Sequence, residues 1–229
     1  ESIEYNAGGD VYILTLNGYI YEEETCALSG GNRAVIYFDG KGTDKLVIEV
    51  KGNNTLTCNA PANSSASGIF AEKADLYIQG SGTLNVTANS RNGTETYGIF
   101  ARKTLRISGD GIVNAEANVD AGSGSNNIYY WCAIVANTLD MEGGTVTATA
   151  NQHPNKDESY ALNVPSMSIT GGSLTAKGYT TVCSRTGDSV SLGNGVTAVV
   201  SSDYNGSNPT AYKSNTTMGA VKYFHASKT

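Results

Sequence analysis

Several features that mark other protein classes are scarce or missing in this chain of 229 residues. It has 4 Pro, 2 His and 1 Trp, and charged residues make up only 16% of it. Lys and Arg number 15 against 21 Asp and Glu, a formal net charge of −6, and no basic cluster offsets this excess. We therefore expect neither a nucleic acid nor an anionic membrane surface as the main partner, because both reward clustered cations. No apolar run approaches the ~20 residues of a membrane helix, so no transmembrane segment is expected.

Cysteine is also sparse, and its spacing matches no zinc or redox motif. The four are Cys26, Cys58, Cys132 and Cys183. We expect small apolar thiols, with Cys58 facing inward and Cys183 outward in the strand pattern below. A disulfide between Cys26 and Cys58 stays open as an alternative.

What the chain does contain is typical of a turn-rich β protein. It has 27 Gly, and 39% of its residues are hydrophobic, enough to build a core. The length fits one domain or one elongated solenoid. An Asn-, Thr- and Gly-rich surface with little charge resembles that of secreted bacterial proteins, so we expect an extracellular or cell-surface location.

The strongest pattern is a repeat that occurs five times between residues 67 and 200. Each unit has three short alternating segments, and its first segment begins at Gly68, Gly98, Ala133, Ala161 or Thr181. A unit this small cannot bury its apolar face alone, so the units must stack, which is typical of a solenoid.

Alternation within the segments predicts which side chains form the core. The third segments place apolar residues inward and Asn, Thr, Glu or Lys outward; the inward sets are Leu84/Val86/Ala88, Val113/Ala115/Ala117, Val146/Ala148/Ala150, Leu174/Ala176 and Val196/Ala198/Val200. A pair of glycines precedes each set, as expected for a tight corner that needs positive φ. Looser copies precede the five units, around Ile36 to Cys58 and at Tyr12 to Gly18.

The predicted fold class is therefore all-β: a single-stranded, right-handed parallel β-helix with three short strands per coil and about six to seven coils. Residues 1–229 form a single domain in this interpretation. Residues 1–33 would be an N-terminal cap and first rung, residues 34–200 the repeat coils, and residues 201–229 a C-terminal cap, since solenoid ends must be covered.

An unexpected row of aromatic residues appears on the outside of the first segments. With Ile36, Ile69 and Ile99 inside, the next residues Tyr37, Phe70 and Phe100 face solvent, one rung of ~4.8 Å apart. Exposed apolar rows of this kind often mark an interface. We therefore take Tyr37, Phe70 and Phe100 as candidate ligand-binding residues.

The repeats differ in length mainly at one corner, between the third segment and the next first segment. Insertions on one face of a solenoid often form its binding face. The longest of these loops contains Tyr129, Tyr130 and Trp131, whose rings could stack on sugar rings while Asn, Ser and Thr meet the hydroxyls. Alternatively, these aromatic residues fold back and cover the row formed by Phe70 and Phe100.

Calcium is a possible cofactor, because it prefers clustered carboxylates and backbone carbonyls. The candidate ligands are Asp39, Asp44, Asp120 and Asp157, although none has EF-hand or nonapeptide spacing. Asp39 and Asp44 fit an Asp-Gly turn equally well.

No catalytic set is visible. A glycoside hydrolase needs converging carboxylates, whereas the outward Asp140 and Glu116 are scattered, and His153 and His225 lie in a loop and in the tail. We therefore expect no enzyme, with a pectate-lyase-like enzyme kept as an alternative.

Two longer stretches go beyond generic solenoid patterning: Ala34-Val-Ile-Tyr-Phe-Asp-Gly40 and Leu46-Val-Ile-Glu-Val-Lys-Gly-Asn-Asn-Thr-Leu56. Together with the Gly-Ile-Phe-Ala units, they resemble the bacterial extracellular carbohydrate-binding β-helix proteins, whose studied type binds polygalacturonate and calcium. The likeness covers roughly residues 10–200. It implies a non-catalytic surface protein that binds an acidic polysaccharide through calcium bridges, but it assigns no ligand to a particular residue here.

The functional prediction is a secreted or cell-surface, non-catalytic protein that binds an acidic plant or host polysaccharide, possibly pectic. Because the chain is itself negative, calcium would have to bridge the two. The alternative is a structural or adhesive stalk without a glycan site, which would contact neighbours on the cell surface.

Overall fold

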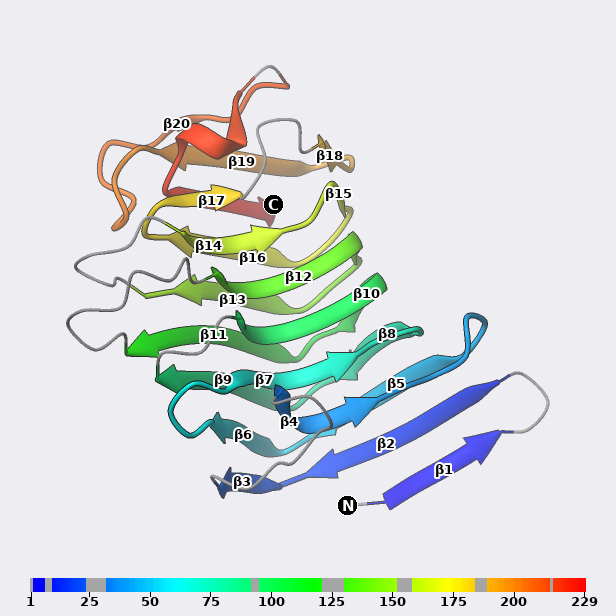
Figure 1. Ribbon diagram of the computed structural model, residues 1–229. Coiled ribbons are helices and arrows are strands. Elements are labelled where there is room, and N and C mark those ends of the chain that lie inside the picture. Colours follow the sequence, from blue (N-terminus) through cyan, green and yellow to red (C-terminus); the bar gives the residue numbers. More distant parts are fainter. Residues whose placement is uncertain are drawn as a thin grey trace.

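The computed structural model describes residues 2–6, 10–23, 32–91, 95–120, 130–151, 158–183, 189–214 and 216–229. These residues form an all-β parallel solenoid of about five turns, whose coils stack from β1–β3 at one end to β19 and β20 at the other (Figure 1). The predicted fold class is confirmed, with fewer coils than the six to seven expected.

Two sheets form the walls of the solenoid. Sheet A holds the first and second segments of the repeat: β1 (Ser2–Asn6), β2 (Val11–Asn17), β4 (Asn32–Phe38), β5 (Lys45–Lys51), β7 (Ser65–Ala71), β8 (Asp75–Gly80), β10 (Glu95–Gly109), β12 (Tyr130–Met141), β14 (Ser159–Asn163), β15 (Ser166–Ile169), β17 (Thr181–Cys183) and β18 (Ser189–Leu192).

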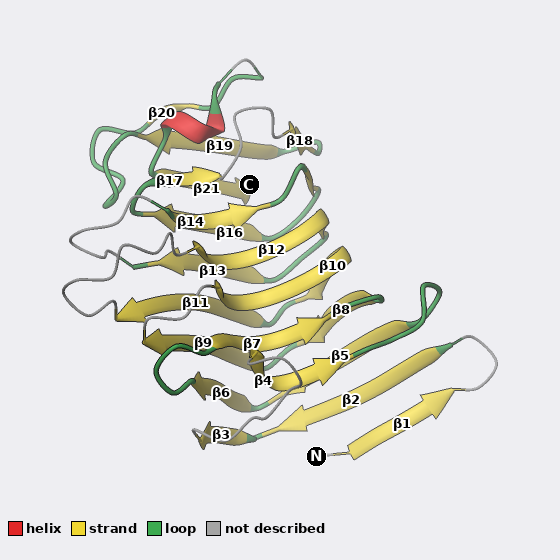
Figure 2. Cartoon of the chain, in the orientation of Figure 1, coloured by secondary structure: helices red, strands yellow, loops and turns green. Residues whose placement is uncertain are grey.

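Sheet B holds the third segments. Its strands are β3 (Ile20–Glu23), β6 (Asn53–Asn59), β9 (Thr83–Arg91), β11 (Ile112–Asp120), β13 (Thr145–Ala150), β16 (Ser173–Gly178), β19 (Val196–Ser201), β20 (Thr210–Ala211) and β21 (Tyr223–Lys228). The described loops lie at the corners, and a 3-10 turn, η2 (Met218–Ala220), precedes β21 (Figure 2).

The core lies between the two sheets and consists of the predicted inward columns. Strands β9, β11, β13 and β16 pair in parallel and in register, so that like residues of the repeat stack on one another. The inward residues of these four strands are buried, as are the second-segment residues Leu76, Leu105 and Leu139. The alternation in the sequence therefore predicts the core of the four central coils correctly.

The glycine corners meet two separate requirements. One glycine in each corner has positive φ, for example +86° at Gly109 and +74° at Gly144. The other glycine leaves room for the coil below: a Cβ on Gly111 would lie 2.6 Å from the carbonyl oxygen of Gly82. The sequence pattern predicts both glycines from backbone conformation alone. The structure shows that the glycine without positive φ is required by the close stacking of neighbouring corners.

The first and second segments are continuous in two coils, where they form the long strands β10 and β12. The alternation reverses within both strands. Gly98 and Ala133 are not paired with each other, although the residues on either side of them are, as Tyr97 with Cys132 and Ile99 with Ile134. A Cβ on Gly98 would point at the backbone of sheet B, so two successive residues face inward. The side chains before this point consequently change sides.

The N-terminal rung forms largely as predicted. Strands β2 and β3 pair in parallel with β5 and β6, and β1 adds an antiparallel strand at the edge of sheet A. Cys58, Cys132 and Cys183 are buried, whereas Cys26 lies outside the described residues. The outward placement of Cys183 is wrong, because β17 pairs with β14 one residue out of the expected register, matching Cys183 to Leu162.

At the other end, the fifth unit stacks on the fourth only in part. Strand β18 pairs in parallel with β15 in the expected register, but the third segments of the two units, β16 and β19, are not neighbours. Strand β21 lies between β16 and β19 and is antiparallel to both. Its inward residues Phe224 and Ala226 are fully buried and continue the core columns. The tail therefore forms an internal strand of sheet B, rather than a covering over the last coil.

Candidate functional site

The outer face of sheet A carries a connected group of six aromatic rings, which we call the aromatic ribbon. Tyr37, Phe70 and Phe100 occupy the same register position on β4, β7 and β10. Neighbouring ring centroids along the ribbon are 5.9, 4.3, 5.2, 6.0 and 5.5 Å apart, in the order Tyr37, Phe70, Phe100, Tyr97, Tyr130 and Tyr160.

The rings of the ribbon largely cover one another. Phe70 and Phe100 stack almost parallel, with an angle of 7° between their planes, and the guanidinium carbon of Arg102 lies 5.7 Å from the Phe100 centroid. The most exposed ring is Tyr37, at 41%. Its hydroxyl donates to Glu72 Oε2 at 2.8 Å, and this hydrogen bond raises the pKa of Tyr37 to about 12. A ribbon stacked in this way mainly offers ring edges to solvent.

The three aromatic residues expected in the longest loop have different locations. Trp131 is fully buried beneath sheet A, where its indole N–H donates to the Asn151 carbonyl at 3.2 Å, so it presents no face to a ligand. Tyr130 belongs to the ribbon, and Tyr129 lies outside the described residues. Tyr97 and Tyr160 were missed, because strict alternation does not anticipate two successive inward residues. These are Gly98 and Ile99 after Tyr97, and Ala161 and Leu162 after Tyr160.

Two of the candidate calcium ligands already interact with protein groups. Asp39 pairs with the Lys73 ammonium at 2.7 Å, and the buried Asp44 carboxylate accepts the Lys41 backbone N–H at 2.7 Å. This is the turn that the Asp-Gly sequence predicts. The side chain of Asp120 and all of Asp157 lie outside the described part, and within that part no three metal-ligating side chains cluster.

A polar groove crosses the outer face of sheet B. It is open, has a volume of about 420 Å³, and spans β9, β11 and β13. Amide, hydroxyl and carboxylate side chains from three successive coils line it: Asn85, Thr87, Asn114, Glu116, Thr147 and Thr149, together with Ala115. The sequence indicated these residues only as the outward side of a strand, which is also what an ordinary solvated face looks like.

Hydrogen bonds between coils order one part of the groove. Asn114 Nδ2 donates to Asn85 Oδ1 at 2.8 Å, and the Asn151 amide donates to Glu116 Oε1. By contrast, the hydroxyls of Thr87, Thr147 and Thr149 make no hydrogen bond with any residue that the structure describes.

Asparagines form a ladder along the edge of the groove. The amide of Asn89 donates to Asn59 at 2.8 Å, that of Asn118 donates to Asn89 at 3.0 Å, and that of Asn151 donates to Asn118. Tyr204, from the segment after β19, reaches the top of this ladder, and its hydroxyl donates to Asn151 Oδ1 at 3.3 Å. Burial and the negative charge of Glu116 raise the pKa of Tyr204.

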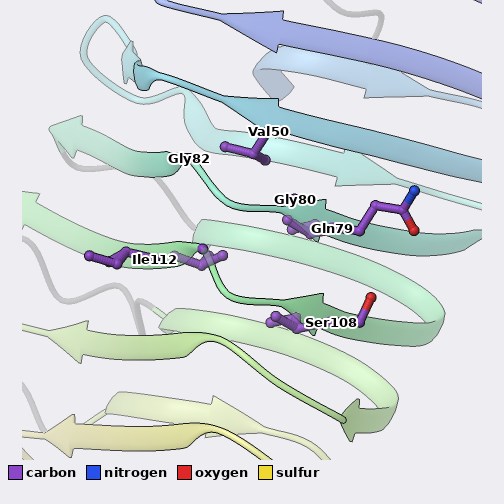
Figure 3. A pocket seen from close by; sticks show the side chains of 10 residues that line it. Val50, Gln79, Gly80, Gly82, Ser108 and Ile112 are labelled. Carbon is purple, nitrogen blue, oxygen red and sulfur yellow. The ribbon is translucent and has the colours of Figure 1, made fainter.

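A second hollow, at the glycine corner, is too small for an organic ligand. It has a volume of about 10 Å³ and lies beneath Gly80, Gly82 and Gly111, enough for one water molecule at most. Gln79 and Ser108 extend from neighbouring strands on the same side of this corner, as Figure 3 shows.

The protein is therefore a parallel β-solenoid with two different outer faces, the aromatic ribbon on sheet A and the polar groove on sheet B. The chain matches no protein-family model, and neither a curated protein nor a solved structure is significantly similar to it. Among the helical segments that the structure describes, none is long and apolar enough to cross a membrane.

Proposed function

We propose that the protein is a non-catalytic polysaccharide-binding protein that acts outside the cell or on its surface. The observation that supports this best is the polar groove on sheet B, where three coils present hydroxyls and amides at the same register positions. The composition, rich in Asn, Thr and Gly and poor in charge, supports the extracellular part of this proposal.

The chemistry of the groove suits sugar hydroxyls, each of which both donates and accepts hydrogen bonds. Thr hydroxyls have the same double capacity, amides provide a donor and an acceptor, and Glu116 accepts. Because successive coils repeat every ~4.8 Å, an extended glycan lying along the solenoid axis would meet a similar set of groups at each rung. The groove is open to solvent, as binding of a polymer requires.

Binding to a panel of immobilised polysaccharides tests this proposal. A Thr147→Val/Thr149→Val variant keeps the β-branched shape but removes two groove hydroxyls. At ~0.5–1.5 kcal/mol per hydrogen bond, it should bind roughly tenfold more weakly. Thr197→Val, on the exposed face of β19 outside the groove, is the matched control and should bind normally. Equal binding by both variants would move the site elsewhere.

The aromatic ribbon is a second candidate surface for the same function. Tyr37 has the most exposed ring of the six, so Tyr37→Ala should weaken glycan binding if sugars stack there. If binding is unchanged while Tyr37→Ala lowers stability, the ribbon serves the architecture instead. Ring-on-ring stacking supports that second outcome, and it is also what a structural or adhesive stalk would need.

Calcium bridging and catalysis have their own tests. If calcium bridges an acidic glycan to the protein, EDTA should abolish the binding. A pectate-lyase-like activity would release unsaturated product from pectic substrates in the presence of calcium, and we expect none. Glu116 is the single carboxylate among the residues that line the groove, whereas hydrolysis by the usual route needs two.

A further inference from the structure

We infer that the polar groove selects uncharged sugars, with the Glu116 carboxylate accepting hydroxyl hydrogen bonds from the ligand. This inference rests on the proposed polysaccharide-binding function and names the class of sugar. It differs from the expectation of an acidic, calcium-bridged glycan.

Glu116 occupies the centre of the groove. In the register of sheet B it lies between Thr87 on β9 and Thr149 on β13, both of which also line the groove. None of the lining residues is a cation. The next residue in the same column is Lys177, and its ammonium lies 6.0 Å from the centroid of the Tyr223 ring, outside the groove lining. An anionic sugar in the groove would therefore meet the negative charge of Glu116, and no cation among the residues that line the groove would offset it.

The orientation of Glu116 is set by a chain of hydrogen bonds. The Tyr204 hydroxyl donates to Asn151 Oδ1, and the Asn151 amide donates to Glu116 Oε1. These contacts engage one carboxylate oxygen, whereas Oε2 makes no hydrogen bond within the described part of the chain. Tyr204 and Asn151 are thus positioning residues, and Oε2 is the atom that would receive a sugar hydroxyl.

An ionised carboxylate is a strong acceptor for hydroxyl groups. Charge-assisted O–H···O⁻ hydrogen bonds are roughly twice as strong as neutral ones, and Thr87 and Thr149 can bond to adjacent hydroxyls of the same ring. A uronate offers a carboxylate in place of one of these donors, and two like charges at close range oppose binding. The groove therefore favours a neutral sugar both by attraction and by repulsion.

Paired ligands that differ only in charge provide the test. We would measure the affinity of the full chain for a polyuronate oligosaccharide and for its methyl ester, by calorimetry, with and without EDTA. We expect the ester to bind at least tenfold more tightly, with no effect of EDTA. Glu116→Gln, which keeps the amide contact of Asn151, should bring the two affinities within about twofold of each other.

Two further variants separate charge from position. Glu49→Gln removes the same charge from sheet A and should leave the preference intact. Tyr204→Phe removes the hydroxyl that holds Asn151 and should weaken binding of the ester about two- to fivefold, without changing which ligand is preferred. Circular dichroism and thermal melting would check that each variant folds.

The outcomes test the preference for uncharged sugars separately from the proposed polysaccharide-binding function. Tighter binding of the polyuronate, or a preference that survives in Glu116→Gln, overturns the inference while polysaccharide binding stands. If neither ligand nor any member of the glycan panel binds, both fail together. Abolition of binding by EDTA would instead establish the calcium-bridged acidic glycan.

Discussion

At the scale of single residues, Asn54 shows how a polar side chain can replace an apolar one in the core. It is fully buried and lies in the column that holds Leu84 in the next coil. Its amide donates to the carbonyls of Lys51 at 2.9 Å and Thr83 at 3.2 Å, and its Oδ1 accepts the Tyr19 N–H at 2.9 Å. The side chain therefore ties the corners of the first coils together.

Replacing Asn54 by Ala should be strongly destabilising. The change leaves partly buried backbone groups of Tyr19 and Lys51 without the Asn54 side chain as a partner, at about 1–3 kcal/mol for each unsatisfied group. We expect the free energy of unfolding in urea to fall by roughly 2–4 kcal/mol. Asn53→Ala, at the exposed neighbouring position, is the control. Similar losses in the two variants would show that the buried hydrogen bonds matter little.

Tyr97 should make the protein sensitive to alkali. Burial in the aromatic ribbon, together with the nearby charge of Glu95, raises its pKa in the folded state. The unfolded chain, with an ordinary tyrosine pKa of about 10, loses this proton first as the pH rises. Stability from this group is therefore complete below pH 10 and is lost above it, by up to about 1.4 kcal/mol per pH unit.

The Tyr97→Phe variant tests this contribution. Its free energy of unfolding should fall less steeply than that of the parent chain between pH 10 and pH 11, measured by urea denaturation. Identical slopes would show that Tyr97 does not contribute to the alkaline transition.

The sequence predicts the direction of most side chains, and its errors at Trp131 and Tyr97 share one cause. Alternation places Leu84, Val113 and Val146 inside correctly, because nothing interrupts those strands. It fails at Trp131 and Tyr97, because two successive residues face inward at Gly98 and Ala133. The sequence of a short apolar segment does not reveal such a reversal, because either assignment of inward and outward residues places hydrophobic side chains inside.

At the scale of elements, replacing a corner glycine can cost free energy in two ways: through backbone conformation, and through a clash with the neighbouring coil. Different glycines in this chain show these two costs separately. Gly18 has φ of +68° and open space around its Cβ position. Gly111 lacks positive φ, but a Cβ added to it would lie 2.6 Å from the Gly82 carbonyl oxygen. Gly109 combines both conditions, because its φ is +86° and an added Cβ would lie 2.5 Å from the Gly80 carbonyl oxygen.

Alanine substitutions at these three positions should differ in a defined order. Gly18→Ala should cost about 1–2 kcal/mol from backbone conformation alone. Gly111→Ala should cost more, because neighbouring corners have to move apart, and Gly109→Ala should cost the most. Thermal unfolding of the three variants provides the measurement. A cost for Gly111→Ala below that for Gly18→Ala would contradict the role of close stacking.

Sequence repeats predict which segments become strands better than they predict how the strands pair. The pairing of β9, β11, β13 and β16 was anticipated because each carries the same inward and outward columns. The position of β21 was not anticipated. Phe224 and Ala226 alternate like any inward pair, and alternation does not distinguish a parallel neighbour from an antiparallel one.

At the scale of the whole molecule, β21 links the last coil to the rest of sheet B. Phe224 is fully buried, and its ring packs edge-on against Tyr212 at 5.9 Å. Strand β19 has β20 and β21 as its neighbours in the sheet, so its contact with the parallel stack in sheet B passes through β21.

Phe224→Ala should therefore loosen one end of the solenoid. We expect a loss of about 3–5 kcal/mol from the cavity and faster amide hydrogen exchange in β19 and β21, while β9 and β11 stay protected. Tyr223→Ala, at the half-buried outward position, should change the exchange much less. Uniformly faster exchange in every coil would show instead that the molecule opens as a single unit.

The candidate site also belongs to this scale, which limits what the sequence could reveal about it. Outward Asn85, Asn114 and Thr147 were visible as a polar strand face, and stacking of the coils brings them into one groove. Tyr204 could not be placed, because its contact with Asn151 joins residues of different coils through an irregular segment after β19. Such contacts depend on the path of the chain, which no repeat encodes.

The position of β21 has a consequence for synthesis of the protein. The N-terminal residues leave the ribosome first, so the coils up to β16 can stack one after another as they emerge. Strand β19, the third segment of the fifth unit, cannot take its final place in that order, because its neighbour β21 is made after it. Until residues 223–228 leave the ribosome, the edge of β16 stays open, and a nascent chain that pauses there exposes a strand able to pair with another molecule.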